Sequence, residues 1–166
     1  SEHEAQLMNY LLMLDCGHGK LVNFRTPSVE SRFVNAPVTS EARTRFTVHV
    51  DGWQADTTVR DWVVAMLRDW GTGLELPLYH QAIVHHLGGP ESILRQIPLF
   101  RDGCSLGNQR FHCIGSNAAF RLTAFTQDLS PYAQQLMRLL NHCELTAIHW
   151  INIAKDKVTF TTVTKP

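Results

Sequence analysis

Residues 93–126, ILRQIPLFRDGCSLGNQRFHCIGSNAAFRLTAFT, determine the fold class of this 166-residue chain. Apolar and polar side chains alternate in three runs, 93–100, 109–114 and 118–126. A period of two predicts β-strands, because successive side chains of a strand point to opposite faces of the sheet. Turn residues at 101–103 and 115–117 separate the runs. Pro98 has no N–H to donate, which places the first strand at an edge or irregular position of the sheet.

Helical periodicity flanks these strands on both sides. Apolar residues recur at i, i+3, i+4 and i+7 over 58–70, and similar faces lie at 75–87 and 131–143. Thr58 and Ser130 can serve as the N-caps of the first and third helices. An apolar run, 147–153, and an alternating run, 158–163, predict a final pair of strands. The order α-α-β-β-β-α-β-β predicts an α/β (α+β) fold with a mixed central sheet flanked by helices.

The first 57 residues have a different pattern. Residues 4–14 predict an amphipathic helix with Leu7, Leu11 and Leu14 on one face, and 20–24 predict a short strand. Residues 25–45 contain prolines and no sustained period, so they predict an irregular arm, and 46–50 alternate like a strand. One helix and one strand cannot form a core, so we expect the three leucines to be buried against another surface.

An internal repeat links the two ends of the chain. Residues 3–24, HEAQLMNYLLMLDCGHGKLVNF, align without a gap at an offset of 129 with residues 132–153, YAQQLMRLLNHCELTAIHWINI. The five identical positions are Gln6/Gln135, Leu7/Leu136, Met8/Met137, Leu11/Leu140 and Asn23/Asn152. Duplication is the favoured interpretation, and chance likeness of two amphipathic helix–strand units is the alternative. The expected domains are 1–24, the end of a first copy; 25–57, an arm; and 58–166, a whole second copy.

Composition excludes several classes of protein. Lys and Arg together number 15, as do Asp and Glu, which excludes a strongly electropositive chain but not a local basic stripe. No apolar run approaches the ~20 residues that span a bilayer. The four cysteines show no C-x-x-C spacing, and the nine histidines show no zinc-finger spacing. We expect reduced, buried or half-buried thiols, no structural zinc and a cytoplasmic location.

The repeated segment carries a family resemblance. HEAQLMNYLLMLDCGHGKLVNF resembles the C-terminal helix and strand of the bacterial GxxExxY proteins, which belong to the PD-(D/E)XK nuclease superfamily. Gln6-x-x-x-Tyr10 matches the Q-x-x-x-Y motif of that family. The second copy resembles the family more weakly, with Gly73-x-x-Leu76-x-x-Tyr79 in place of Gly-x-x-Glu-x-x-Tyr. The resemblance implies a restriction-endonuclease-like core of a helix, three strands, a helix and a further strand.

The resemblance also implies where the catalytic residues would stand. In active members the second strand supplies an Asp and the third a Glu-x-Lys, which hold a divalent ion, commonly Mg²⁺, and activate water. The family spacing places Glu-x-Lys on Arg121-Leu122-Thr123, and the Asp near Phe111 or His112. Residues 109–127 contain no Asp or Glu. We therefore expect a catalytically degenerate domain, with no catalytic residues, no metal ligands and no cofactor.

Three functions remain open at this point. The first is a non-catalytic nuclease-like domain that supports folding, dimerisation or nucleic-acid docking, with the catalytic half of a GxxExxY protein or a second copy as partner. The second is an active Mg²⁺-dependent nuclease fragment with ligands migrated to Asp128, Glu91 or Glu75. The third is a protein-interaction module without a nucleic-acid role, and no function implies a membrane. Nucleic acid, if bound, would contact six residues: Gln6, Tyr10, Lys20, Arg121, Gln135 and Arg138.

Overall fold

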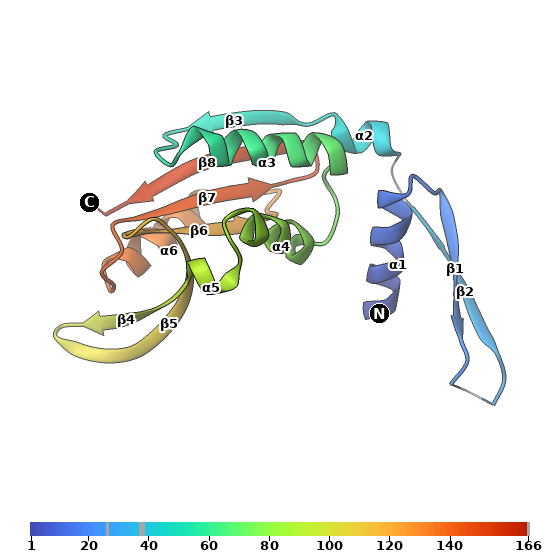
Figure 1. The fold of residues 1–166 in the computed structure, drawn as a ribbon, viewed down its shortest axis with the longest axis horizontal. Helices are drawn as coiled ribbons and strands as arrows, with labels where there is room; N and C mark the ends of the chain where they lie inside the picture. Colours follow the sequence, from blue (N-terminus) through green and yellow to red (C-terminus); the bar gives the residue numbers. More distant parts are fainter. Residues whose placement is uncertain (26, 37–38, 166) are drawn as a thin grey trace.

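The computed structural model describes residues 1–25, 27–36 and 39–165. Two sheets organise the chain, a two-stranded hairpin near the N-terminus and a six-stranded mixed sheet that forms the main body (Figure 1). The order of strands in the main sheet is β3-β8-β7-β6-β5-β4. Its strands are β3 (Thr47–Asp51), β4 (Leu94–Arg101), β5 (Cys104–Ile114), β6 (Ala118–Thr123), β7 (Ala147–Ile153) and β8 (Lys157–Thr164). The predicted mixed sheet is therefore confirmed.

The strand directions follow from the connections. Strands β4, β5 and β6 form an antiparallel meander with tight turns, and β4 is an edge strand, as Pro98 predicted. Strand β7 runs parallel to β6, which requires a crossover, and helix α6 (Ser130–Leu140) supplies it. Strand β8 returns antiparallel to β7 and carries β3 on its other side in parallel. Residues 104–108, which lie outside the predicted strands, extend β5, and the β4–β5 hairpin curls away from the body (Figure 1).

Helices cover both faces of this sheet. Helices α3 (Thr57–Trp70) and α4 (Leu76–His86) pack on one face around Val63, Leu67, Ile83 and Phe160, which are almost fully buried. Helix α6 packs on the opposite face, where Leu140 lies with Ile148 and other residues of a second apolar cluster. A four-residue helix, α5 (Pro90–Ile93), connects α4 to β4. Ile148 and Trp150 of β7 enter one cluster and Ile151 and Ile153 enter the other, which explains why the strand is apolar on both faces.

The helix termini differ from the prediction in detail. Asp56, and not Thr58, is the N-cap of α3, and its carboxylate accepts a hydrogen bond from the Thr58 N–H at 2.8 Å. Ser130 lies inside α6, and Asp128 Oδ1 accepts from its N–H at 2.9 Å. Asp56 and Asp128 precede the expected caps by two residues, and a carboxylate accepts as well as a hydroxyl does.

The N-terminal unit consists of helix α1 (Glu2–Met13), strand β1 (His18–Asn23) and strand β2 (Glu30–Asn35), and it lies beside the main body (Figure 1). The two strands pair antiparallel. The irregular arm expected over 25–45 is therefore wrong in part, because it contains β2 and the short helix α2 (Ser40–Thr44). The sequence of β2 gave no signal because both of its faces are largely exposed.

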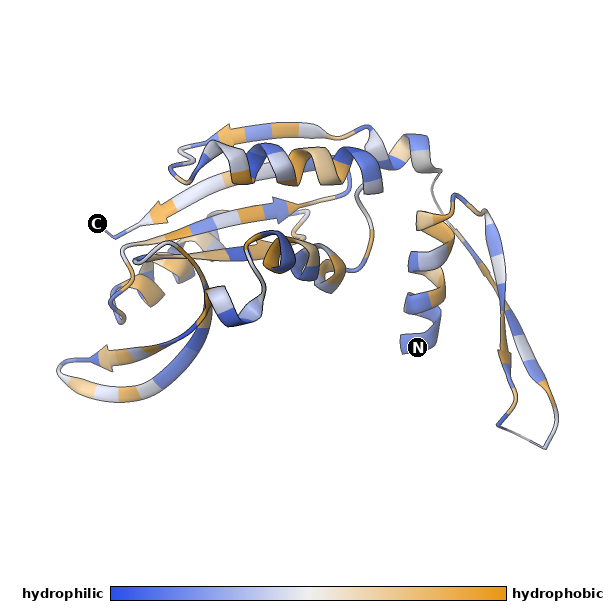
Figure 2. Ribbon diagram, in the orientation of Figure 1, coloured by the Kyte–Doolittle hydropathy of each residue, from blue (hydrophilic) through white to orange (hydrophobic). Residues whose placement is uncertain are grey.

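The expected burial of the leucine face of α1 is confirmed for Leu11 and in part for Leu7, which is half-buried. Both pack over Gly19 of β1, and Leu12 belongs to the apolar cluster of the main body. Leu14 is 72% exposed, so its expected burial is wrong. It follows the last residue of α1 and therefore leaves the helical face. Figure 2 shows apolar and polar bands alternating along α1 and the two strands.

The repeat extends further in the structure than in the sequence. Strands β1 and β2 correspond to β7 and β8 at the same offset of 129. His18 pairs with Asn35 in the first hairpin, and Ala147 pairs with Thr164 in the second, so both partners are displaced by 129. Helix α1 likewise corresponds to α6. A chance likeness of two helix–strand units does not require the same hairpin register, so the structure favours duplication.

The four cysteines are all free thiols. Cys113 and Cys143 are buried as expected, whereas Cys16 and Cys104 are exposed because each lies in or beside a turn. Among the described residues, no helix combines the length and the apolar character needed to cross a membrane.

Candidate functional site

The positions that the family resemblance assigns to catalysis lie on neighbouring strands. Strands β5 and β6 pair antiparallel through Cys113↔Ala119 and Ile114↔Ala118. Phe111 is buried in the apolar cluster beneath α6. Arg121 is exposed on β6, and Thr123 is buried. The site thus presents an aromatic ring, a cation and a hydroxyl where a metal centre requires carboxylates.

A closed hydrogen-bond network surrounds Thr123, the position that the family resemblance assigns to a lysine. Trp150 Nε1 donates to Thr123 Oγ1 at 2.8 Å, and Thr123 Oγ1 donates to Asn152 Oδ1 at 2.7 Å. Asn152 also accepts from the Phe125 N–H at 2.8 Å and donates through Nδ2 to the Phe125 carbonyl at 3.0 Å. The Thr123 hydroxyl therefore donates and accepts within the protein, and the network stabilises the end of β6.

Arg121 borders a second polar region on the same face. Its Nε donates to Tyr132 Oη at 3.2 Å, and the Tyr132 ring lies 5.0 Å from the Phe125 ring and 5.1 Å from that of Trp150, between centroids. A cavity of about 460 Å³ opens here, lined by Ala124, Phe125, Thr126, Gln127, Asp128, Pro131, Tyr132 and Gln135. The cavity has one carboxylate in its lining, which is too few for a divalent cation.

The proposed migrated ligands do not converge. Asp128 accepts from the Ser130 N–H, and that hydrogen bond lowers the pKa of its carboxyl. Glu91 lies in α5, and Glu75 is the N-cap residue of α4. Within residues 1–25, 27–36 and 39–165, no group of three or more His, Cys, Asp or Glu side chains is arranged to hold a metal ion.

The opposite face of β5 and β6 carries a pair of histidines, of which the sequence analysis named only His112, as a possible position of the family Asp. The rings of His80 and His112 meet edge to face with centroids 4.5 Å apart, and the Phe120 ring lies 5.5 Å from His80. Burial lowers the pKa of His80, and the neighbouring His112 and Arg121 lower it further. Burial and Arg121 likewise lower the pKa of His112. These shifts favour neutral imidazoles, which can stack and accept hydrogen bonds.

The Gly73-x-x-Leu76-x-x-Tyr79 segment connects the loop after α3 to helix α4. The Tyr79 hydroxyl donates to the Gly71 carbonyl at 2.6 Å and accepts from the Leu74 N–H at 3.0 Å, so it ties the loop between α3 and α4 to the helix that follows. Gly71 has a φ of +75°, and a Cβ at this position would lie 2.7 Å from Cβ of Arg43. Leu76, at the position of the family glutamate, lines a neighbouring cavity of about 340 Å³.

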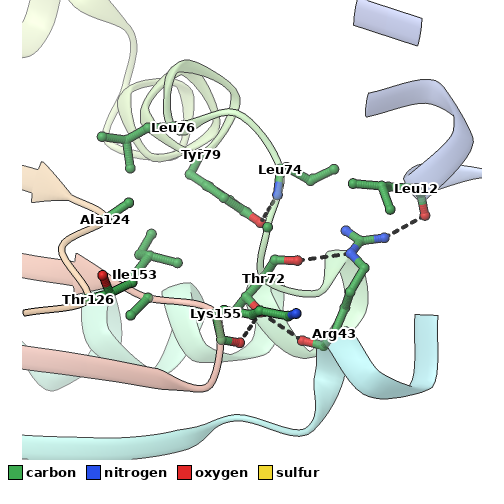
Figure 3. A pocket seen from close by; sticks show the side chains of 12 residues that line it. Leu12, Arg43, Thr72, Leu74, Leu76, Tyr79, Ala124, Thr126, Ile153 and Lys155 are labelled. Carbon is green, nitrogen blue, oxygen red and sulfur yellow. Dashed lines mark hydrogen bonds between the residues drawn. The ribbon is translucent and has the colours of Figure 1, made fainter. Parts of the chain in front are cut away.

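Arg43 is another residue that sequence reasoning missed, because it lies in the segment expected to be irregular. Its side chain is buried, and its guanidinium donates to three main-chain carbonyls: Nε to Thr72 at 2.9 Å, Nη1 to Leu12 at 2.6 Å, and Nη2 to Trp70. Figure 3 shows the first two of these bonds at the edge of the 340 Å³ cavity. Arg43 thereby connects α1, α2 and the loop after α3.

The six residues expected to contact nucleic acid fall into two groups. Gln6, Tyr10 and Lys20 belong to the N-terminal unit, where Gln6 Nε2 donates to Tyr10 Oη at 3.3 Å and Lys20 Nζ lies 5.4 Å from the Phe33 ring centroid. The remaining three, Arg121, Gln135 and Arg138, are exposed on β6 and α6. Of these three, Gln135 lines the 460 Å³ cavity and Arg121 contacts Tyr132, another residue of its lining.

Comparison of the chain with protein-family models, with curated proteins and with solved structures found no match.

Proposed function

We propose that this chain contains a non-catalytic PD-(D/E)XK nuclease-like domain, similar to those of the GxxExxY proteins, that serves as a docking unit. The observation that carries the proposal is the pair of strands β5 and β6. They occupy the second and third places in a helix, three-strand, helix, strand order, yet hold Phe111, Arg121 and Thr123 where that fold would need metal ligands and a lysine. The buried Thr123–Asn152–Trp150 network fills this position with satisfied polar groups.

A cleavage assay tests the absence of catalysis. We expect the purified chain to cleave neither plasmid DNA, single-stranded DNA nor RNA with Mg²⁺ or Mn²⁺, because a hard divalent ion needs several oxygen ligands. The alternative is an active nuclease with migrated ligands. Metal-dependent cleavage that Asp128→Asn or Glu91→Gln abolishes, while Asp102→Asn at the exposed hairpin turn does not, would establish that alternative and refute the proposal.

The partner proposed for this docking unit is the sheet of another nuclease-like core, such as the catalytic half of a GxxExxY protein. In the second copy, β7 has β8 on one side and β6, in parallel, on the other. The corresponding strand β1 pairs with β2 in the same register, and within the described residues it has no second neighbour. By analogy with β7, the open edge of β1 would accept a parallel strand that resembles β6.

Asn23 gives this docking a specific contact. Its counterpart Asn152 binds both the N–H and the carbonyl of Phe125 at the end of β6. In the N-terminal unit Asn23 Oδ1 instead accepts from the Arg25 N–H at 3.0 Å, and its side chain is exposed. An asparagine at this register position is thus available to a docked strand. Phe24 and Phe33, 79% and 66% exposed, supply apolar surface on the same unit.

A labelled peptide of residues 116–127, which includes β6, is the probe for this edge. We expect saturable binding in fluorescence anisotropy, weakened roughly tenfold by Asn23→Ala, because the two main-chain bonds would be lost. Asn35→Ala, on the outer strand β2, is the matched control and should leave the affinity unchanged. Equal effects of the two substitutions would contradict the proposed edge. Sedimentation of the unlabelled chain identifies the other partner, since a second copy would give a concentration-dependent dimer.

Nucleic acid is a second candidate partner, favoured by the exposed Arg121. Its Nε donates to Tyr132 Oη, and Tyr132 lines the 460 Å³ cavity together with Gln135, so an exposed cation lies next to a polar hollow that phosphate could approach. Arg121→Gln should weaken DNA binding and reduce the slope of log affinity against log salt by about 1, whereas Arg101→Gln on the β4–β5 turn should change neither. If DNA bound with an affinity that did not depend on salt, or did not bind at all, the result would favour a protein-interaction module.

A further inference from the structure

The 340 Å³ cavity beside Arg43 has an unusual distribution of charge. Two cations, Arg43 and Lys155, lie in its wall, and its lining has no carboxylate. Arg43 is 3% exposed, and among the described residues no carboxylate lies within 4.0 Å of its guanidinium. Its three partners are neutral carbonyls. Buried charges in proteins are normally paired with an opposite charge, so this site retains an uncompensated positive charge.

The remainder of the lining is mostly apolar. Leu12 enters from α1, Leu74, Leu76 and Tyr79 from the loop and helix α4, and Ile153 from the end of β7 (Figure 3). Two hydroxyls of the lining are already engaged within the protein: Thr72 Oγ1 bonds to the Arg43 and Lys155 carbonyls at 3.1 and 2.5 Å, and Tyr79 Oη bonds to Gly71 and Leu74. A ligand would therefore meet an apolar wall and one cationic end.

We propose that this cavity binds a small organic anion, a carboxylate on an apolar body of about ten non-hydrogen atoms. The carboxylate would lie toward Arg43 and Lys155, and the body would contact the leucines and Ile153. The size follows from the volume, since 340 Å³ holds about eleven groups of the ~30 Å³ that one water molecule occupies in the liquid. The sign of the ligand charge follows from the two cations and the lack of acidic lining residues.

The site also joins parts of the chain that are distant in sequence. Its walls come from α1, α2, the loop between α3 and α4, and the ends of β6 and β7. A bound ligand would contact all of them, so it should raise the thermal stability of the whole chain through mass action. This inference is independent of the nuclease-like docking function.

Octanoate, octanol and octylammonium are the probes, compared by calorimetric titration of the full chain. We expect octanoate to bind with a Kd of about 0.1–1 mM, at the level of ligand efficiency typical of small ligands. Octanol should bind at least threefold more weakly, and octylammonium should not bind, because its charge repels the two cations. Octanoate should also raise Tm. The proposal would be overturned if octylammonium bound as tightly as octanoate. It would also be overturned if no binding were detected at an octanoate concentration tenfold above the upper end of this Kd range.

Two substitutions at exposed lining positions locate the site without disturbing the core. Ala124→Trp should fill the mouth of the cavity and abolish octanoate binding, and Lys155→Gln should weaken it about three- to tenfold. Lys157→Gln, two residues along at the start of β8 and outside the lining, is the matched control and should leave the affinity unchanged. Unchanged affinity in Ala124→Trp, or equal losses in the two lysine variants, would show that octanoate binds elsewhere and would refute the site.

Discussion

Replacement of Tyr79 by Phe isolates the contribution of one buried hydroxyl. The ring of Tyr79 is 1% exposed, and its hydroxyl links the Gly71 carbonyl to the Leu74 N–H. Phe preserves the ring but leaves both main-chain groups without this partner. An unsatisfied buried group costs about 1–3 kcal/mol, so we expect Tyr79→Phe to lower the free energy of unfolding by about 2–4 kcal/mol.

Thermal unfolding and urea denaturation measure this loss. For a chain of this length about 1 kcal/mol corresponds to a Tm change of about 2–4 °C, so a loss of about 2–4 kcal/mol should lower Tm by about 4–16 °C. Tyr132→Phe is the matched control, because the Tyr132 hydroxyl accepts a single bond from the exposed Arg121 and its loss should cost at most about 0.5 kcal/mol. If Tyr79→Phe proved no more destabilising than Tyr132→Phe, the structural role of the tyrosine would be refuted.

Three further substitutions or conditions test the packing. Gly71→Ala should lower the free energy of unfolding by more than about 2 kcal/mol in denaturant, because the new Cβ would lie 2.7 Å from the buried side chain of Arg43. Gly103→Ala is the control: Gly103 has a similar φ of +79° but open space around it, so this substitution should cost only about 1 kcal/mol. Leu11→Ala should cost about 2–4 kcal/mol in the same assay, and a loss below 1 kcal/mol would mean that α1 does not pack on its hairpin. Burial lowers the folded-state pKa of His80 and His112, so the unfolded chain binds more protons than the folded chain once the pH falls below about 6.5. The stability that the two neutral histidines contribute should therefore be complete above about pH 6.5 and should decrease as the pH falls toward their lowered pKa. A Tm that did not change between about pH 7.5 and pH 5 would contradict the burial of the pair.

Periodicity predicted the main body because its elements are half-buried. Strand β7 was predicted with its observed limits, and α3, α4, α6 and β8 to within a few residues, since each presents an apolar face to one of two clusters. Strand β2 left no such signal. Five of its six residues are exposed, so neither face of the strand requires apolar side chains and the sequence shows no alternation.

The polar residues of the site were harder to predict. Thr123 was recognised as unable to replace a lysine, but its bonds to Trp150 and Asn152 arise only when β6 and β7 pair in parallel. Arg43 was missed altogether. A charged residue in a segment without periodicity predicts an exposed side chain, and its burial depends on three carbonyls that come from positions 12, 70 and 72.

The shared register of the two hairpins has a consequence for the kinetics of folding. During folding β6 can pair with either of two strands of similar length, β1 or β7. These strands are separated from β6 by about 95 and 24 residues of chain, respectively. Loop closure favours β7 by only about 1.2 kcal/mol, because its entropic cost grows with the logarithm of loop length.

Side chains must therefore distinguish the correct strand from its competitor. Asn23 and Asn152 are equivalent and cannot do so, but Trp150 donates to Thr123, and its counterpart in β1 is Leu21, which has no N–H on its side chain. Without the indole donor, β1 would become a closer rival for β6, and refolding of Trp150→Leu should populate a kinetically trapped species that the unmodified chain avoids.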